Sequence, residues 1–342
     1  MDFDLLKKLT DAPGIPGREE AVGDIIKTHL LHITKNVSID GMGNIIARVP
    51  GKGPKLLIDA HMDEVGLMAQ YIDPFGFIRF VPLGGIDPKT MFSSTVNVWT
   101  NEGPLRGVIC SMPPHLKKAD AGDAVSFEEL FIDLGLPADK IKEKVMPGDP
   151  ITFTNQWHEN PYSVQAKALD DRLGVFVMLE AMKNLTKTGC ELYLSTSVQE
   201  EMGLRGAGPI ARKIKPDIVI ALEGTVANDL PGVPPHKTLA CLGKGPEIRL
   251  CDAKFIAHRK LCDFLIGIGS RQGIPFQVVV KKAGATNAAS FQVDGIGARA
   301  AALSVPVRYI HSGTGIAWKD DIKNTIRLLK AFLIEIHTWD EI

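Results

Sequence analysis

Continuous apolar runs and helix-period stripes alternate along most of the chain. Lys55–Ile58 and Asp217–Leu222 are short runs with little polar interruption, which is typical of strands buried on both faces of a sheet. Leu173–Leu185 is apolar nearly all round and predicts a buried helix, whereas Asp321–Thr338 has one apolar face and predicts an amphipathic helix. This alternation predicts an α/β fold with a mixed, mostly parallel sheet.

The pattern changes between Tyr71 and Pro161. Short alternating runs such as Phe77–Val81 and Thr95–Thr100 are separated by Gly, Pro and Asp turns, and one stretch, Phe127–Leu134, has helical spacing. Frequent short strands with turn residues between them favour a small β-barrel or sandwich. We therefore predict a β-rich domain at 72–161, inserted into an α/β domain made of 1–71 and 162–342.

Composition then narrows the class of protein. The 342 residues are 45% hydrophobic and 23% charged with a formal net charge of -1, which gives no bulk reason to expect nucleic acid or a membrane as a partner. No apolar run reaches the ~18 residues of a membrane span, and the N-terminus lacks the apolar region of a signal peptide. The five cysteines are scattered without a C-x-x-C pair, so we expect reduced thiols and a cytoplasmic location.

Chemistry-bearing residues follow the predicted strands at the points where the strands end. In open α/β sheets, ligands bind beyond the carboxyl ends of the strands. Two histidines with several carboxylates and no thiolate suit a pair of divalent ions, with Zn favoured and Co or Mn as alternatives. The candidates are His61, Glu200, Glu201, Glu223 and His311, and the pair Asp170-Asp171 at the start of a helix.

A two-metal centre needs about five ligand positions, one of them shared by both ions. The candidates therefore leave one carboxylate to carry protons during peptide hydrolysis, and the residues alone allow either Glu200 or Glu201 to do so. Asp63 lies two residues after His61 and can accept its free ring N–H. Asp171 either contacts the metal ligands and positions them, or is a negative charge that the dipole of the helix favours at its N-terminus.

Four motifs carry a family resemblance. They are Ala60-His-Met-Asp-Glu-Val-Gly-Leu-Met68, Ala168-Leu-Asp-Asp-Arg172, Val198-Gln-Glu-Glu-Met-Gly-Leu-Arg-Gly-Ala207 and Arg308-Tyr-Ile-His-Ser312. Together with the N-terminal segment Leu6–Gly17, they resemble the tetrahedral (TET-type) cocatalytic metalloaminopeptidases. That family includes glutamyl and deblocking aminopeptidases, and some members carry the label endoglucanase.

The resemblance implies specific roles. It implies that His61, Asp170 and Glu223 hold one ion, and that Asp170, Glu201 and His311 hold the other. Glu200 is then the general acid/base, and Asp63 orients His61. The resemblance also implies a three-layer αβα metallopeptidase domain, an inserted dimerisation domain, short peptides as substrates, and a hollow dodecamer of six dimers.

The chain departs from the family pattern at three places. Glu223 stands where Asp is usual, Asn287 replaces the Asp of a Gly-Gly-Thr-Asp-Ala motif, and the segment after Ser312 reads Gly-Thr-Gly-Ile-Ala-Trp318. Because 312–318 contains Ile316 and Trp318 but no charge, we expect it to line a pocket that prefers neutral, apolar N-terminal residues. Three alternatives stay open: a metal-dependent deacylase of small N-acyl compounds, a glycosidase acting through paired carboxylates, and a catalytically impaired paralogue.

Overall fold

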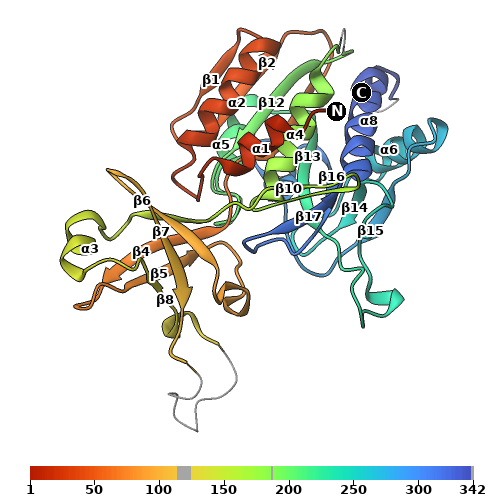
Figure 1. The fold of residues 1–342 in the computed structure, drawn as a ribbon. Helices are drawn as coiled ribbons and strands as arrows, with labels where there is room; N and C mark the ends of the chain where they lie inside the picture. The colour runs from red at the N-terminus through yellow and green to blue at the C-terminus, as the bar shows by residue number, and fades with distance from the viewer. Residues whose placement is uncertain (114–124, 186–187, 340–342) are drawn as a thin grey trace.

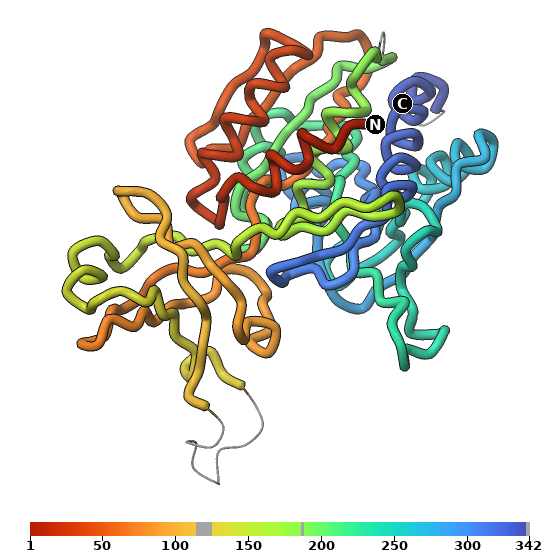
Figure 2. The backbone as a smooth tube through the Cα atoms, viewed as in Figure 1, coloured from red at the N-terminus to blue at the C-terminus, as the bar shows by residue number. Residues whose placement is uncertain are grey.

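The computed structural model describes residues 1–113, 125–185 and 188–339. The chain forms a large domain with a central sheet and a smaller lobe that projects from it (Figure 1). Figure 2 follows the smaller lobe, orange to yellow, out of the large domain and back into it. Each part has its own hydrophobic core. None of the described helices is long and apolar enough to cross a lipid bilayer.

Eleven strands of the described chain form one mixed sheet in the large domain. The central strands β12, β3, β13 and β16 run parallel, and the strands toward both edges are antiparallel. In spatial order the strands are β1 (Val37–Ile39), β2 (Ile45–Val49), β12 (Glu191–Ser197), β3 (Lys55–His61), β13 (Ile218–Val226), β16 (Arg299–Arg308), β17 (Gly315–Trp318), β11 (Ser163–Ala166) and β10 (His158–Glu159), with β14 (Glu247–Cys251) on β16 and β15 (Gln277–Val280) on β14.

Helices cover both faces of this sheet, which confirms the predicted three-layer fold. α4 packs on the central strands and is fully buried along most of its length, as its all-round apolar sequence predicts. α5 and α7 contact each other, and α7 packs on β3, β13 and β16 while α5 packs on β12. The helices of the large domain are α1 (Asp4–Asp11), α2 (Glu20–Ile33), α4 (Leu169–Met182), α5 (Ala207–Ile214), α6 (Arg259–Arg271), α7 (Asn287–Val293) and α8 (Lys319–Glu335).

The smaller lobe is a closed antiparallel barrel. Its strands, in order around the barrel, are β4 (Gly66–Ile72), β5 (Ile78–Leu83), β8 (Phe131–Asp133), β7 (Gly103–Cys110), β6 (Thr95–Thr100) and β9 (Pro150–Phe153), and the helix α3 (Ala138–Lys144) also belongs to this lobe. The barrel strands thus span 66–153, whereas the sequence placed the insertion at 72–161. The difference arises because β4 begins only a few residues after β3, and because β10 pairs with β11 in the large sheet.

The predicted helix at Phe127–Leu134 is wrong. Only Phe127–Glu129 forms a 3-10 turn, and Phe131–Asp133 is the strand β8. Ile132 is fully buried in the barrel core and pairs with both Ile78 and Ile109. These tertiary strand pairings override the local helical spacing.

Candidate metal centre

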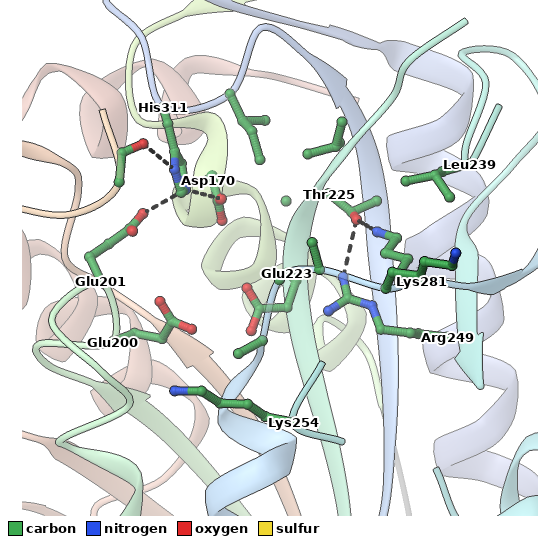
Figure 3. Close-up of a pocket in the computed structure, with 18 of the residues that line it drawn as sticks. Asp170, Glu200, Glu201, Glu223, Thr225, Leu239, Arg249, Lys254, Lys281 and His311 are labelled. Atoms are coloured by element: carbon green, nitrogen blue, oxygen red, sulfur yellow. Dashed lines mark hydrogen bonds and ion pairs between the residues drawn. The ribbon is translucent and has the colours of Figure 1, made fainter. Parts of the chain in front are cut away.

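The predicted ligands converge at the carboxyl ends of the central strands (Figure 3). His61 is the last residue of β3, and Glu223 lies within β13. Glu200 and Glu201 follow β12 after Gln199, and His311 follows β16; Gln199 and His311 both have positive φ, 53° and 58°. These turns redirect the backbone at the strand ends, so that residues distant in sequence face one space.

Asp170 lies between the two histidines. Its Oδ1 is 3.4 Å from Nε2 of His61, and its Oδ2 is 3.3 Å from Nε2 of His311. One carboxylate therefore presents one oxygen to each imidazole. This is the arrangement of a ligand shared by two ions.

The three glutamates differ in how closely they approach the histidines. Glu201 Oε1 is 3.2 Å from His311 Nε2, and Glu223 Oε2 is 3.6 Å from His61 Nε2. Glu200 Oε2 stands farther away, at 3.9 Å from His61 Nε2. The longer side chain of Glu223 thus still reaches the cluster, although Asp is usual at this position in the family that the sequence resembles.

Two further aspartates hold the cluster in place. Asp63 Oδ1 is 3.4 Å from His61 Nδ1, and the Asp63 carboxylate accepts the backbone N–H groups of Glu200 and Glu201 at 3.0 and 3.1 Å. Asp171 accepts the backbone N–H of His61 at 3.2 Å and that of Gly174 at 2.8 Å. Asp171 also forms, with His61 and Glu223, one of the groups whose ligand atoms lie within 4.8 Å of one another.

The electrostatics of the cluster call for cations. Burial is the largest influence on Glu200 and raises its pKa to about 8, and burial likewise raises the pKa of Glu201 and Glu223. Burial disfavours the charged form of His311, but Asp170 and Glu201 raise its pKa to about 11. Burial also opposes ionisation of Asp170, yet His311 and His61 hold its pKa well below the usual range.

No lysine or arginine of the described residues pairs with Asp170 or with any of the three glutamates. The buried atoms Asp170 Oδ1 and Glu201 Oε1 also accept no hydrogen bond. Packing several carboxylates together without a cation is costly. The residues present therefore fit divalent metal ions, and three groups of His, Asp and Glu here have ligand atoms within 4.8 Å of one another.

Comparisons with known proteins agree with this site. The model of the M42 glutamyl aminopeptidase family matches residues 43–328. The chain belongs to this family. It is 33% identical over 352 residues to a lysyl aminopeptidase of Pyrococcus furiosus, an alignment that covers 99% of each chain. It is therefore a hydrolase of the aminopeptidase type.

Two solved structures share the fold. A TET aminopeptidase from a marine sediment Thaumarchaeota archaeon has a TM-score of 0.94 and 32% identity, covering 97% of this chain and 95% of that chain. The Pyrococcus horikoshii TET1 peptidase, described as assembling into a tetrahedron or a large octahedral shell, has a TM-score of 0.86 and 33% identity, covering 97% and 99%. The TET-type resemblance is thus confirmed.

A cavity of about 1050 Å³ opens beside the cluster of this M42 protein. Its wall includes five basic side chains that the sequence reading did not assign to the site: Lys237, Arg249, Lys254, Lys281 and Lys282. Lys237 ends the 3-10 turn Pro235–Lys237, Arg249 is in β14, and the other three follow β14 or β15, so all five are distant in sequence from the metal motifs. In the sequence, the adjacent basic residues Lys281 and Lys282 just before the Ala-Gly-Ala-Thr286 segment could have indicated a basic wall near the site.

The expectation that 312–318 lines this cavity is wrong. Ile316 pairs with Gln165 of β11 and with Arg308 of β16, and the ring of Trp318 lies against Gly243. The cavity wall takes only Ile310 and His311 from this part of the chain. The predicted preference for neutral residues loses its basis, because charged side chains, both basic and acidic, are among the residues that line the cavity.

Asn287, the third departure from the family pattern, lies outside the ligand cluster. It is buried and donates hydrogen bonds to Asp59 Oδ2 at 3.0 Å and to Ser197 Oγ at 2.7 Å. Asp59 is fully buried and also accepts from Ser195 and Ser197. An aspartate in place of Asn287 would set two carboxylates against each other, so the amide suits this environment.

Proposed function

We propose that the protein is a dinuclear metalloaminopeptidase that removes N-terminal residues from short peptides. The observation that carries this proposal is Asp170, which offers one carboxylate oxygen to each of the two histidine-centred groups. A mononuclear site would not require a carboxylate in this position. The family membership supplies the reaction class independently of this geometry.

In this proposal His61, Asp170 and Glu223 hold one ion, while Asp170, Glu201 and His311 hold the other. Nitrogen and oxygen donors without thiolate favour Zn, with Co or Mn as alternatives. Divalent ions bound there would supply Lewis acidity toward the peptide carbonyl and toward water. Asp63 keeps the ring of His61 oriented through its contact with Nδ1, so that Nε2 faces the centre.

Glu200 is the proton carrier in this scheme. It is the glutamate farthest from the histidines, yet it lines the cavity beside them. Burial raises its pKa to about 8, which suits a group that must both take and release a proton near neutral pH. Glu200 takes a proton from the attacking water and delivers it to the leaving amine nitrogen. Asp63 holds Glu200 in place through the backbone N–H.

The charges in the cavity favour an acidic N-terminal side chain. Arg249 and Lys281 are buried and already paired with Glu247 and Asp252, so their charges are balanced. Lys237, Lys254 and Lys282 line the same cavity, and none of them forms an ion pair with another described residue. Figure 3 shows the amino group of Lys254 extending toward Glu200 at the mouth of the metal cluster.

The test is a panel of aminoacyl anilides, assayed on the wild-type protein and on Lys254→Met. The wild type should prefer Glu-anilide over Leu- and Lys-anilide. Loss of one solvent-exposed charge contact is worth about 0.2–1 kcal/mol, so Lys254→Met should narrow that preference by about 2- to 5-fold. Lys35→Met, at an exposed lysine elsewhere, is the control. A wild-type preference for Lys-anilide would refute acidic recognition, and no anilide hydrolysis at all would refute the aminopeptidase proposal.

Self-association is part of the proposal. The barrel exposes large apolar side chains, among them Phe75 at 79% and Tyr71 at 55%, with Phe92, Leu136 and Met146 also exposed. Such a surface on a small β-barrel suits contact with a second copy of the chain. The tetrahedron or octahedral shell described for the Pyrococcus horikoshii relative supports a large assembly of copies, which we propose to be a dodecamer built from dimers. A closed shell of this kind would admit short peptides and exclude folded proteins.

A further inference from the structure

A second cavity, of about 510 Å³, adjoins the one that contains the metal cluster. Thr90 and Ile310 belong to the walls of both cavities, so the two cavities are neighbours near His311. One wall comes from the barrel, through the segment at 92–95 and the end of β9, and the other comes from the loop at 312–314. The volume lies within the ~300–1,000 Å³ typical of small-ligand sites.

The second cavity has a different chemistry from the first. Eight of the residues that line it have a hydroxyl group: Thr90, Ser93, Ser94, Thr95, Thr154, Tyr309, Ser312 and Thr314. No Asp, Glu, Lys, Arg or His is among the described residues that line it. The Oγ1 atom of Thr154 is buried and has no hydrogen-bond partner in the described structure. A buried hydroxyl without a partner is costly unless a ligand or water satisfies it.

The loop that separates the two cavities is held firmly. The His311 ring contacts the carbonyl of Gly85 through Nδ1 at 3.0 Å, which ties the loop to the barrel side. Ser312 donates from Oγ to the carbonyl of Tyr309 at 2.7 Å. Gly313 lies so close to the Phe153 ring that an added Cβ would be 3.2 Å from it. The boundary between the two cavities is therefore fixed by contacts between this loop and the barrel.

We propose that this second cavity binds the part of the peptide that follows the scissile bond. This inference rests on the proposed aminopeptidase function. The cationic cavity then takes the N-terminal side chain, and the leaving chain passes His311 into the hydroxyl-lined space. Neutral hydroxyls can hydrogen-bond peptide N–H and C=O groups whatever the side chains are. The enzyme would thus select the first residue by charge and accept varied residues after it.

The first experiment replaces Gln156 with Lys in one variant and with Glu in another. Gln156 is an exposed residue of this cavity, so its replacement does not disturb the core. The substrates are the tripeptides Glu-Ala-Asp and Glu-Ala-Lys, with Glu-anilide as the reference that has no second or third residue. Gln156→Lys should raise the kcat/KM ratio of Glu-Ala-Asp to Glu-Ala-Lys by about 2- to 5-fold, and Gln156→Glu should lower it by a similar factor.

The second experiment removes the unpartnered hydroxyl with Thr154→Val. The kcat/KM ratio of Glu-Ala-Ala to Glu-anilide should fall by about 2- to 10-fold, the typical effect of one hydrogen bond. Thr28→Val, on the exposed surface of α2, is the matched control and should leave that ratio unchanged.

Two results would overturn the inference. One is tripeptide ratios that are the same in the wild type and both Gln156 variants. The other is a change in preference among anilides with different N-terminal residues, which would mean that this cavity holds the first side chain. Failure of the wild type to hydrolyse any of these substrates would instead overturn the proposed function.

Discussion

Glu200 and Glu201 are adjacent in sequence, but the structure gives them different surroundings. Glu201 Oε1 is 3.2 Å from His311 Nε2, next to the shared Asp170, whereas Glu200 is 3.9 Å from its nearest histidine nitrogen. The two glutamine substitutions are isosteric, and each removes one negative charge. We therefore predict that Glu200→Gln retains the metal and loses turnover, and that Glu201→Gln loses metal.

The magnitude follows from the role of each group. A positioned general acid/base contributes about 10²–10⁴-fold to the rate, so Glu200→Gln should lower kcat by that factor, or about 3–5 kcal/mol of transition-state stabilisation. A neutral amide cannot replace the charge of Glu201 as a ligand. One ion per chain should therefore dissociate from Glu201→Gln, and activity should recover in part when excess metal is added.

The assay measures kcat for Glu-anilide and metal content by mass spectrometry on the same protein samples. Glu20→Gln, on the exposed face of α2, is the control and should match the wild type in both measurements. If Glu200→Gln lost metal while Glu201→Gln kept it and lost turnover, the two roles would be exchanged. If neither variant changed kcat or metal content, the reasoning would be refuted altogether.

Two further predictions concern stability and assembly. Burial raises the pKa of Glu19 to about 7, so its contribution to stability is fully present below its ordinary pKa of 4.5 and is lost as the pH rises through 7. The unfolding free energy of Glu19→Gln, relative to that of the wild type, should therefore rise by up to about 3 kcal/mol between pH 5 and pH 8. The measurement is the unfolding free energy of both proteins at the two pH values. A difference between the proteins that is equal at both pH values would contradict this. The purified chain should sediment as a dodecamer made of six dimers, and replacing the exposed residues Phe75 and Tyr71 with Ser should shift it toward smaller species; a wild type that sediments as an active monomer would contradict the assembly.

The metal cluster could be predicted from the sequence because its chemistry follows local rules. Each candidate ligand stands at the end of an apolar run or at the start of a helix, and carboxyl ends of parallel strands meet at one edge of a sheet. The continuous apolar pattern of the sequence also predicted the buried strands β3 and β13 and the helix α4. Those elements are buried on all sides, so their apolar pattern is strong.

The substrate cavity could not be predicted in this way. Lys254 follows β14, which is only five residues long and was not recognised, and Lys282 follows the edge strand β15. Their position in the wall of the cavity depends on how β14 pairs antiparallel with β16 and parallel with β15, which no local pattern encodes. The expected lining at Ile316 failed for the same reason, since β17 pairs between β16 and β11 and turns that side chain away from the cavity.

The central claim is that Asp170 joins two metal sites in one chain. Its most direct test is the number of divalent ions per chain in the wild type, His311→Ala and Asp170→Asn, measured by mass spectrometry after equilibration with Zn and removal of free metal. The structure predicts about two ions in the wild type, about one in His311→Ala, and loss of both in Asp170→Asn, because the Asp170 carboxylate has one oxygen within 3.4 Å of each histidine Nε2. A wild type that holds one ion, or a His311→Ala variant that still holds two, would contradict the account.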